Sequence, residues 1–206
     1  MAHKLYTIGH SALPLYTFLA ALKKWKVKVL VDVRSHPGSR RFPHFTQANL
    51  EKALRMSDVE YAFLGTQLGG RPDDPQAYAP DGVMDYAAWR KSRVFQAGLK
   101  RVRHELTACD VALMCSEEDP LNCHRFLMIG PALVALGIEP LHIRKGGVTE
   151  TQQEAEDRLL KQQKLAAAAE GSLFSADRDS ALQTAYLAQA RKCAFRRSPT
   201  SSRGKT

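Results

Sequence analysis

A valine-rich segment at residues 27–33 is the feature that most constrains the fold of this chain. Its branched apolar residues are typical of a strand buried within a parallel sheet, rather than of an antiparallel strand with one wet face. Further short strands are predicted at residues 4–8, 60–64, 110–115 and 138–143. Helical patterns alternate with them, at residues 15–24, 46–56, 86–106 and 123–136. The alternation predicts an α/β fold, a single three-layer domain with a mostly parallel sheet of about five strands and helices on both faces.

The length of 206 residues suits one well-buried domain and is too short for two of ordinary size. Beyond Gly146 and Gly147 the composition changes to a helical pattern rich in Gln, Glu and Ala. We therefore expect the α/β domain over residues 1–147 and a C-terminal helical extension over residues 148–197. Residues 198–206 are small, polar or basic, apart from one proline, and predict a disordered basic tail.

The composition is that of a globular protein, with 44% hydrophobic and 25% charged residues. No apolar run approaches the roughly 20 residues that a membrane span needs, and the N-terminus lacks the pattern of a secretory signal. The four cysteines are few for this length and are not spaced like a disulfide framework, which indicates free thiols in a reducing compartment. We expect a cytoplasmic protein without a membrane partner.

The net charge of +9 is distributed unevenly along the chain. Residues 191–206 contain six basic and no acidic side chains, which leaves 9 − 6 = +3 for the first 190 residues. Positive charge favours an anionic partner such as nucleic acid, but here it is concentrated in the tail. The folded body is therefore expected to be only mildly basic.

Polar and ionisable residues follow the apolar strands at several predicted strand ends. His10 follows the first strand, Asp32 and Arg34 close the second, and Cys115 and Glu117 stand at the end of the fourth. Ligands of open parallel sheets bind beyond the carboxyl ends of the strands. These side chains are therefore expected at one rim of the sheet, around a common site.

The loop at residues 34–45 is rich in cationic side chains and contains no acidic residue. Arginine binds phosphate or carboxylate at two points, and Gly38 allows the backbone to approach such a group closely. The loop predicts an anion-binding element, with a solvated basic loop as the alternative. A second, weaker element of this kind is the stretch from Gly69 through Gly70 to Arg71.

Cys115 is the predicted nucleophile of this rim. A cysteine that faces a helix N-terminus and an arginine such as Arg125 has its thiolate stabilised, which lowers its pKa. Glu117 and His124 could then act as acid and base, with His10 and Asp32 orienting or assisting. Two structural alternatives stand beside this interpretation, a buried inert cysteine and an ion pair of Asp32 with Arg34 or Arg125.

A metal site is the remaining alternative for the soft ligands Cys115, Cys123, His124 and His10. The chain has no C-x-x-C pair, and adjacent residues on a helix diverge by about 100°, which argues against Cys123 and His124 binding one ion. We therefore expect neither a metal nor another cofactor.

Several motifs in this order resemble the family known as domain of unknown function 488. They are Thr7-Ile8-Gly9-His10-Ser11, Val31-Asp32-Val33-Arg34, Ser39-Arg40, Leu68-Gly69-Gly70, Met114-Cys115-Ser116-Glu117, Cys123-His124-Arg125 and His142-Ile143. The resemblance covers roughly residues 4–147 and leaves out the C-terminal extension. It implies a compact cytoplasmic α/β protein of prokaryotic type and does not supply a reaction.

Together these features predict a cytosolic enzyme, a thiol-dependent hydrolase or transferase, acting on a phosphate-bearing or otherwise anionic small molecule, a nucleotide or nucleic acid. The alternative is a non-catalytic module that binds nucleic acid or a nucleotide through the basic loop and the tail. The predicted catalytic residues are Cys115, Glu117, His124, His10 and Asp32. The predicted anion- and substrate-binding residues are Arg34, Ser39, Arg40, Gly69, Gly70, Arg71, Cys123 and Arg125.

Overall fold

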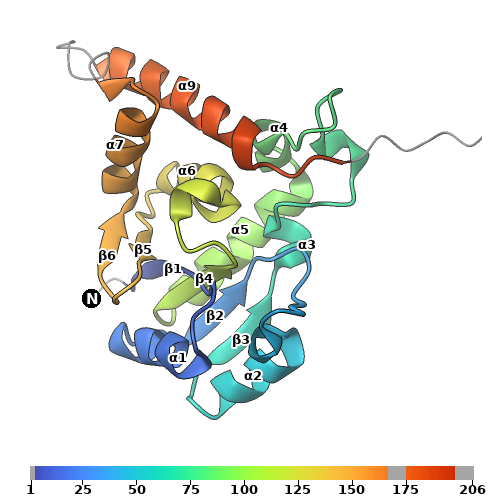
Figure 1. Cartoon of the computed structure of the whole chain (residues 1–206), viewed down its shortest axis with the longest axis vertical. Helices are drawn as coiled ribbons and strands as arrows, with labels where there is room; N and C mark the ends of the chain where they lie inside the picture. The colour runs from blue at the N-terminus through green and yellow to red at the C-terminus, as the bar shows by residue number, and fades with distance from the viewer. Residues whose placement is uncertain (1–2, 167–174, 198–206) are drawn as a thin grey trace, which may run out of the picture.

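The computed structural model describes residues 3–166 and 175–197, so the predicted disordered tail and the end of the helical pattern near Glu170 lie outside the described residues. Six strands form one sheet in the order β3-β2-β4-β1-β5-β6 (Figure 1). They are β1 (Leu5–Gly9), β2 (Val29–Asp32), β3 (Glu60–Phe63), β4 (Val111–Cys115), β5 (Leu141–Ile143) and β6 (Thr149–Thr151). The first five are parallel to one another and β6 is antiparallel to β5, which confirms the predicted α/β fold with a mostly parallel sheet.

The sixth strand lies where the sequence predicted the start of the helical extension. Gly146 and Gly147 both adopt positive φ, at 84° and 73°, and reverse the chain directly after β5. Glycine adopts this backbone region without the steric penalty that a Cβ brings. The reversal lets Thr149–Thr151 pair with β5 before the next helix begins.

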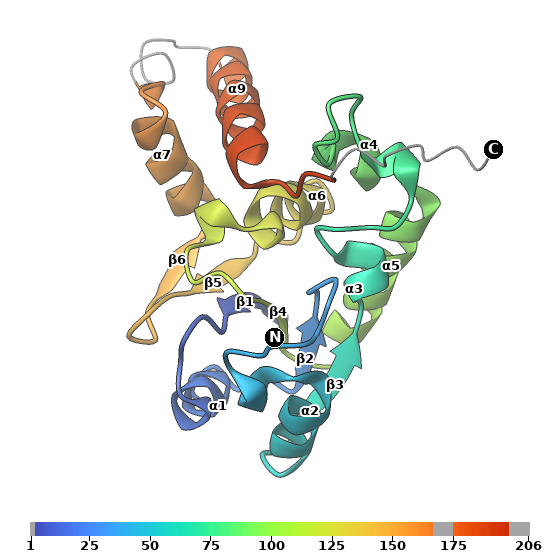
Figure 2. The same cartoon turned by 45° about the vertical axis from the view of Figure 1, so that its right-hand side comes forward.

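Helices cover both faces of the sheet (Figure 2). One face packs against α1 (Leu15–Lys24) and α2 (Gln47–Arg55) through buried side chains such as Phe18, Leu22 and Leu50. The other packs against α5 (Arg93–Leu106) through Phe95, Leu99 and others. Since neighbouring strand residues point to opposite faces, Met114 belongs to the first core and Cys115 to the second. Cys115 thus ends its strand on the α5 side of the sheet.

Two predicted elements are divided in the structure. The helix expected at residues 86–106 consists of α4 (Tyr86–Arg90) and α5, because the Ser92 side chain accepts a hydrogen bond from the Phe95 backbone and starts a new helix. The loop expected at residues 65–81 contains the short helix α3 (Gly65–Leu68) and a 3-10 turn at Pro75–Ala77. Further 3-10 turns lie at Pro43–Phe45 and Pro120–Asn122.

The helix expected at residues 123–136 is also irregular. It begins with a π-helical turn, Arg125–Ile129, and continues as α6 (Gly130–Val134). Pro131 has no backbone N–H to donate to the carbonyl four residues earlier, so a regular α-helix through this point would lack that bond. The following turn contains Gly137 at φ 73°, near the predicted end.

The helical extension packs on the same core as the α/β domain. It consists of α7 (Gln152–Gln162) and α9 (Ser175–Cys193), which lie beside each other in both views (Figures 1 and 2). Leu159 and Ala185 are fully buried in the core that also contains Phe95. After α9, the Phe195 carbonyl accepts a hydrogen bond from the Met84 backbone. The extension is thereby attached to the segment that precedes α4.

Across the described ranges, no helix is both long enough and apolar enough to cross a membrane.

Candidate active site

A cavity of about 310 Å³ lies at the carboxyl ends of β2 and β4. The loop after β2 contributes Arg34, Ser35, His36 and Gly38, and the segment after α3 contributes Gly70 and Arg71. The loop after β4 and the following helical turn contribute Cys115, Ser116, Glu117, Asn122, Cys123 and His124. The ends of β2 and β4, two of the strand ends predicted to share one rim, thus border one cavity, as expected for an open parallel sheet.

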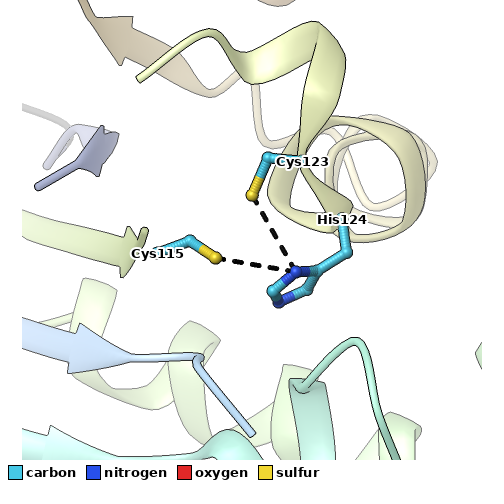
Figure 3. A group of neighbouring side chains, drawn as sticks. All are labelled: Cys115, Cys123 and His124. Carbon is cyan, nitrogen blue, oxygen red and sulfur yellow. Dashed lines mark hydrogen bonds between the residues drawn. The ribbon is translucent and has the colours of Figure 1, made fainter. Parts of the chain in front are cut away.

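Cys115, Cys123 and His124 point toward one another at the floor of this cavity (Figure 3). The His124 Nδ1 atom lies 3.7 Å from the Cys115 Sγ atom and 3.8 Å from the Cys123 Sγ atom. All three side chains are buried. One ligand atom from each lies within 4.8 Å of the other two, so the three could hold a metal ion.

The expected divergence of Cys123 and His124 is therefore wrong. Side chains of adjacent residues diverge by about 100° only when both residues are helical, but Cys123 has φ −134° and ψ 143°, an extended conformation. Only His124, at φ −61° and ψ −21°, has begun the helix. Because the two residues differ in backbone conformation, the 100° rule for a helix does not apply, and both side chains face Cys115.

The His124 ring is oriented by its other nitrogen. Its Nε2 atom lies 3.0 Å from the Val33 carbonyl oxygen, to which it donates a hydrogen bond because a carbonyl can only accept. In the neutral ring this leaves the lone pair on Nδ1, which faces the two sulfur atoms. The backbone at the end of β2 thus selects the tautomer.

The pKa values of the two buried thiols are shifted in opposite directions. A hydrogen bond with Cys123, together with burial, holds the pKa of Cys115 well above its usual value. Burial would also raise the pKa of Cys123, but the hydrogen bond from Cys115 and the charges of Arg125 and His124 lower it well below its usual value. Burial opposes a charge on His124, yet the negative Cys123 raises the pKa of this ring. Burial and the neighbouring groups thus disfavour the thiolate at Cys115, the residue predicted as nucleophile, whereas Arg125 and His124 favour it at Cys123.

Glu117 places a carboxylate beside the thiols. The Cys115 Sγ atom donates a hydrogen bond to Glu117 Oε2 at 3.0 Å. The side chain keeps contact with solvent in the cavity, but the surrounding protein and the charge of Cys123 raise the pKa of this carboxyl group. A raised pKa favours the role of a carboxyl group as proton donor and acceptor.

Asp32 is fully buried and forms an ion pair with Arg34. This pairing is the structural alternative to a catalytic role for Asp32. The Arg34 Nη2 atom lies 2.6 Å and its Nε atom 2.9 Å from the two Asp32 carboxylate oxygens. Asp32 also accepts a hydrogen bond from the Tyr61 hydroxyl group at 2.9 Å. Asp32 thus holds Arg34 in place at the cavity wall and does not itself line the cavity.

His10 is part of this buried network and also does not line the cavity. Its Nε2 atom accepts a hydrogen bond from Arg34 Nη1 at 3.3 Å, and its Nδ1 atom donates one to the Ser11 carbonyl at 3.0 Å. Its ring stacks on Phe45, with ring centroids 4.3 Å apart. Burial lowers the pKa of His10 to about 4, so the ring is neutral at physiological pH.

Arg125 is placed away from the cavity, contrary to its predicted role in anion binding. It is fully buried and donates to the backbone carbonyls of Glu117 and Glu118 and, at 3.1 Å, to the Thr7 hydroxyl group. Its guanidinium group satisfies carbonyl groups that would otherwise be buried without donors. Arg125 thereby shapes the loop after β4 rather than contacting a ligand.

The other predicted anion-binding residues divide into two groups. Ser39 and Arg40 do not line the cavity, because the Ser39 hydroxyl group accepts a hydrogen bond from the Phe42 backbone and Arg40 is exposed outside it. Arg71 does line the cavity, with its guanidinium group 4.7 Å from the Phe195 ring centroid. Of the cationic side chains in the basic loop, Arg34 and His36 reach the cavity.

The two predicted glycines provide space. A Cβ at Gly69 would lie 2.4 Å from the Ser35 hydroxyl oxygen, and one at Gly70 would lie 3.1 Å from His124 Nδ1. Glycine therefore lets this segment pack directly against the loop after β2 and the His124 ring.

Several cavity residues were not predicted from the sequence, namely Tyr86, Asn122, Cys193 and Phe195. Cys193 and Phe195 belong to the C-terminal extension, which lies more than 100 residues along the chain from the basic loop. No local pattern marks them. Only Asn122 had a sequence signal, because it directly precedes the Cys123-His124 pair.

A comparison with known protein families matches residues 14–130 to the family described as domain of unknown function DUF488. The match is shorter than the predicted range of 4–147, but it includes the cavity residues from Arg34 to His124. No curated protein and no solved structure matches the chain. Since the matched residues make up 117 of 206, more than half of the sequence, the chain belongs to the DUF488 family, as its motifs predicted.

Proposed function

We propose that this chain is an enzyme that acts on a small phosphate-bearing or otherwise anionic molecule, such as a nucleotide. One observation carries the proposal. Cationic side chains and a cluster of thiol, imidazole and carboxyl groups line the same cavity. Binding sites with convergent polar groups and shifted pKa values are the preferred locations of catalysis.

Arg71 and His36 supply the anion-binding side of the cavity. The Arg71 guanidinium group lies over the Phe195 ring, 4.7 Å from its centroid, and its N–H groups can bind an anion at two points. Arg34 contributes less, because Asp32 and the Phe45 carbonyl already accept most of its hydrogen bonds. Its buried ion pair keeps the cavity wall in one conformation.

The reactive side consists of Glu117 and the cluster of Cys115, Cys123 and His124. Arg71 and His36 would hold the anionic group of a substrate. The substrate bond next to that group would then lie near this cluster, because all these residues line the same cavity. Glu117 would accept a proton from a water, or from an acceptor hydroxyl group, as its oxygen bonds to the substrate, and would give that proton to the leaving group as the bond to it breaks. The proposed reaction class is hydrolysis or group transfer.

The dimensions of the cavity favour a small molecule over a nucleic-acid duplex. Its volume of about 310 Å³ lies at the lower end of the range of ligand pockets. A non-catalytic nucleic-acid module would instead use the exposed arginines of the basic loop, such as Arg40 and Arg41, which lie outside the cavity.

The binding step is tested by calorimetric titration with inorganic phosphate and with adenosine monophosphate. We expect Arg71→Ala to weaken binding about tenfold, which is roughly 1.4 kcal/mol, because one two-point contact is lost. The matched control Arg40→Ala should change affinity less than about twofold, since a surface charge acts only at long range. Equal losses in both variants, or no binding to the wild type, would overturn the assignment of the cavity.

The catalytic step is tested by screening nucleotides and phosphate esters for product formation. Glu117→Gln preserves the shape of the side chain but cannot exchange a proton, so turnover should fall roughly 10²–10⁴-fold. Phosphate affinity should persist in this variant. Binding without turnover by the wild type, combined with a steep salt dependence for RNA or DNA, would instead support the nucleic-acid module.

A further inference from the structure

We infer that Cys115, Cys123 and His124 form a binding site for a soft divalent metal ion, best fitted by zinc, with one coordination position open to the cavity. The inference stands on the geometry of these three side chains and does not depend on the proposed reaction. It reverses the expectation of no metal, which rested on a helical arrangement that Cys123 does not adopt.

The distances match those of a tetrahedral zinc site. Zinc binds sulfur at about 2.3 Å and imidazole nitrogen at about 2.0–2.1 Å, which places N and S about 3.5 Å apart across a tetrahedron. The observed separations of His124 Nδ1 from the two sulfur atoms are 3.7 and 3.8 Å. Both separations therefore exceed the tetrahedral value by only about 0.3 Å or less, and all three ligand atoms lie within 4.8 Å of one another.

The surroundings of the ligands are those expected for a built site. His124 donates its other ring N–H to the Val33 carbonyl, the arrangement by which proteins orient metal-bound histidines. The Cys115 carbonyl accepts a hydrogen bond from the His10 backbone, so this ligand extends from the parallel ladder of β4 and β1. Two of the ligands are thus held before any ion binds.

Gly70 leaves the ligand nitrogen uncovered. A Cβ at this position would lie 3.1 Å from His124 Nδ1 and 3.2 Å from Cγ of the same ring. Any larger residue would crowd the space next to the nitrogen that faces the sulfur atoms.

The charges also balance. In the bound state Cys115 and Cys123 are thiolates, with any proton they carried released to solvent, and His124 is the neutral ring, so two thiolates neutralise a divalent cation. A neutral assembly is far less costly to bury than an unpaired charge. Soft thiolate ligands with imidazole favour zinc over magnesium or calcium, which prefer oxygen.

The fourth position opens toward Glu117. All three ligands line the cavity, and Glu117 Oε2 lies 3.0 Å from Cys115 Sγ. Three protein ligands with an open position are typical of catalytic rather than structural zinc. A water at this position would be acidic enough to pass its proton to Glu117, a consequence that does rest on the proposed function.

The site is tested with the full chain by adding Co²⁺ or Zn²⁺ under reducing conditions, removing excess metal and measuring bound metal by mass spectrometry. The wild type should retain one equivalent, and the cobalt form should show a thiolate-to-metal charge-transfer band. Cys123→Ser and His124→Asn should each lower the metal affinity by at least about 100-fold, because loss of a ligand exceeds the 10–100-fold effect of a second-shell change. The matched control Cys109→Ser, in a thiol that lies outside both the cluster and the cavity, should retain the metal.

Retention of no metal by the wild type would overturn the inference, as would equal losses in Cys109→Ser and Cys123→Ser. If the ligand variants fail to fold, the spectrum of the wild-type cobalt form decides, because only thiolate ligands produce the charge-transfer band. A cobalt form without this band would then count against the site. Phosphate titrations separate this result from the proposed function, because Arg71→Ala should lose phosphate and keep zinc, whereas Cys123→Ser should lose zinc and keep phosphate binding.

Discussion

Gly9, at the end of β1, lies directly beneath the loop that follows β4. A Cβ at this position would lie 1.7 Å from the Glu117 carbonyl oxygen and 2.9 Å from the Glu118 Cα atom. Both contacts are to backbone, so no side-chain rotation can relieve them. We predict that Gly9→Ala displaces this loop and lowers the free energy of unfolding by about 1–3 kcal/mol or more, as for other overpacked cores.

Urea denaturation measures the change, and Gly38→Ala is its matched control. Among the described residues, no atom lies within 4 Å of a Cβ at Gly38, and the φ of Gly38 is not in the left-handed region. Alanine there should change stability by less than about 1 kcal/mol, in the stabilising direction, because it restricts the unfolded chain. If the free energy of unfolding fell equally in Gly9→Ala and Gly38→Ala, the close contact of Gly9 with the loop after β4 would not explain the effect of the Gly9 substitution.

At the scale of the element, side-chain caps decide where helices start. Ser92 accepts a hydrogen bond from the Phe95 backbone at 3.1 Å and begins α5. We predict that Ser92→Ala lowers the free energy of unfolding by about 1 kcal/mol, the usual effect of losing an N-cap. Thermal or urea unfolding of the two proteins checks this value.

Thr46 provides the contrast, because it precedes α2 but makes no side-chain cap bond. Its hydroxyl group donates instead to the exposed Pro43 carbonyl. Thr46→Ala should therefore have a smaller effect than Ser92→Ala, below about 0.5 kcal/mol. The reverse order would contradict the assignment of the caps. The sequence pattern predicted a helix start at Thr46 and missed the one at Ser92. Both residue types are preferred at helix N-termini, so residue type alone does not show which of the two caps a helix.

At the scale of the whole molecule, two buried neutral histidines make stability depend on pH. Burial lowers the pKa of His10 to about 4 and, with the charge of Arg125, that of His142 to about 3. In the unfolded chain both titrate near about 6.5, so only the unfolded state gains protons as pH falls below this value. The contribution of these two histidines to stability should be complete above about pH 6.5 and decrease by up to about 1.4 kcal/mol per pH unit for each as pH falls toward the folded-state values.

Urea midpoints between pH 7 and 5 test this prediction, in a range above the usual pKa values of carboxyl groups. His142 contacts the Thr7 hydroxyl group at 2.8 Å and Gln152 at 3.0 Å, so His142→Gln retains hydrogen-bonding capacity without a titrating ring. The variant should lose less stability per pH unit than the wild type. An unchanged slope would exclude His142 as a source of the pH dependence.

The sequence by itself determined the alternation of strands and helices and the segments that carry the reactive side chains. These features depend on hydrophobic periodicity and on polar residues at strand ends, both of which are local. The predicted strand ends of Arg34 and Cys115 accordingly meet at one cavity. Periodicity also identified α1 with its observed bounds, because its apolar face is set by residues within three turns of helix.

Only the tertiary structure decided which rim residues face the cavity and which support it. Arg125 turns toward the carbonyls of the loop after β4, and Asp32 turns toward Arg34, because buried polar groups must find partners that the sequence does not name. Phe195 reaches Arg71 across 124 positions of the chain, a contact that depends on how α9 packs. Cys123 and His124 converge on Cys115 because one of them is extended and the other helical, a difference of backbone dihedral angles that residue spacing cannot reveal.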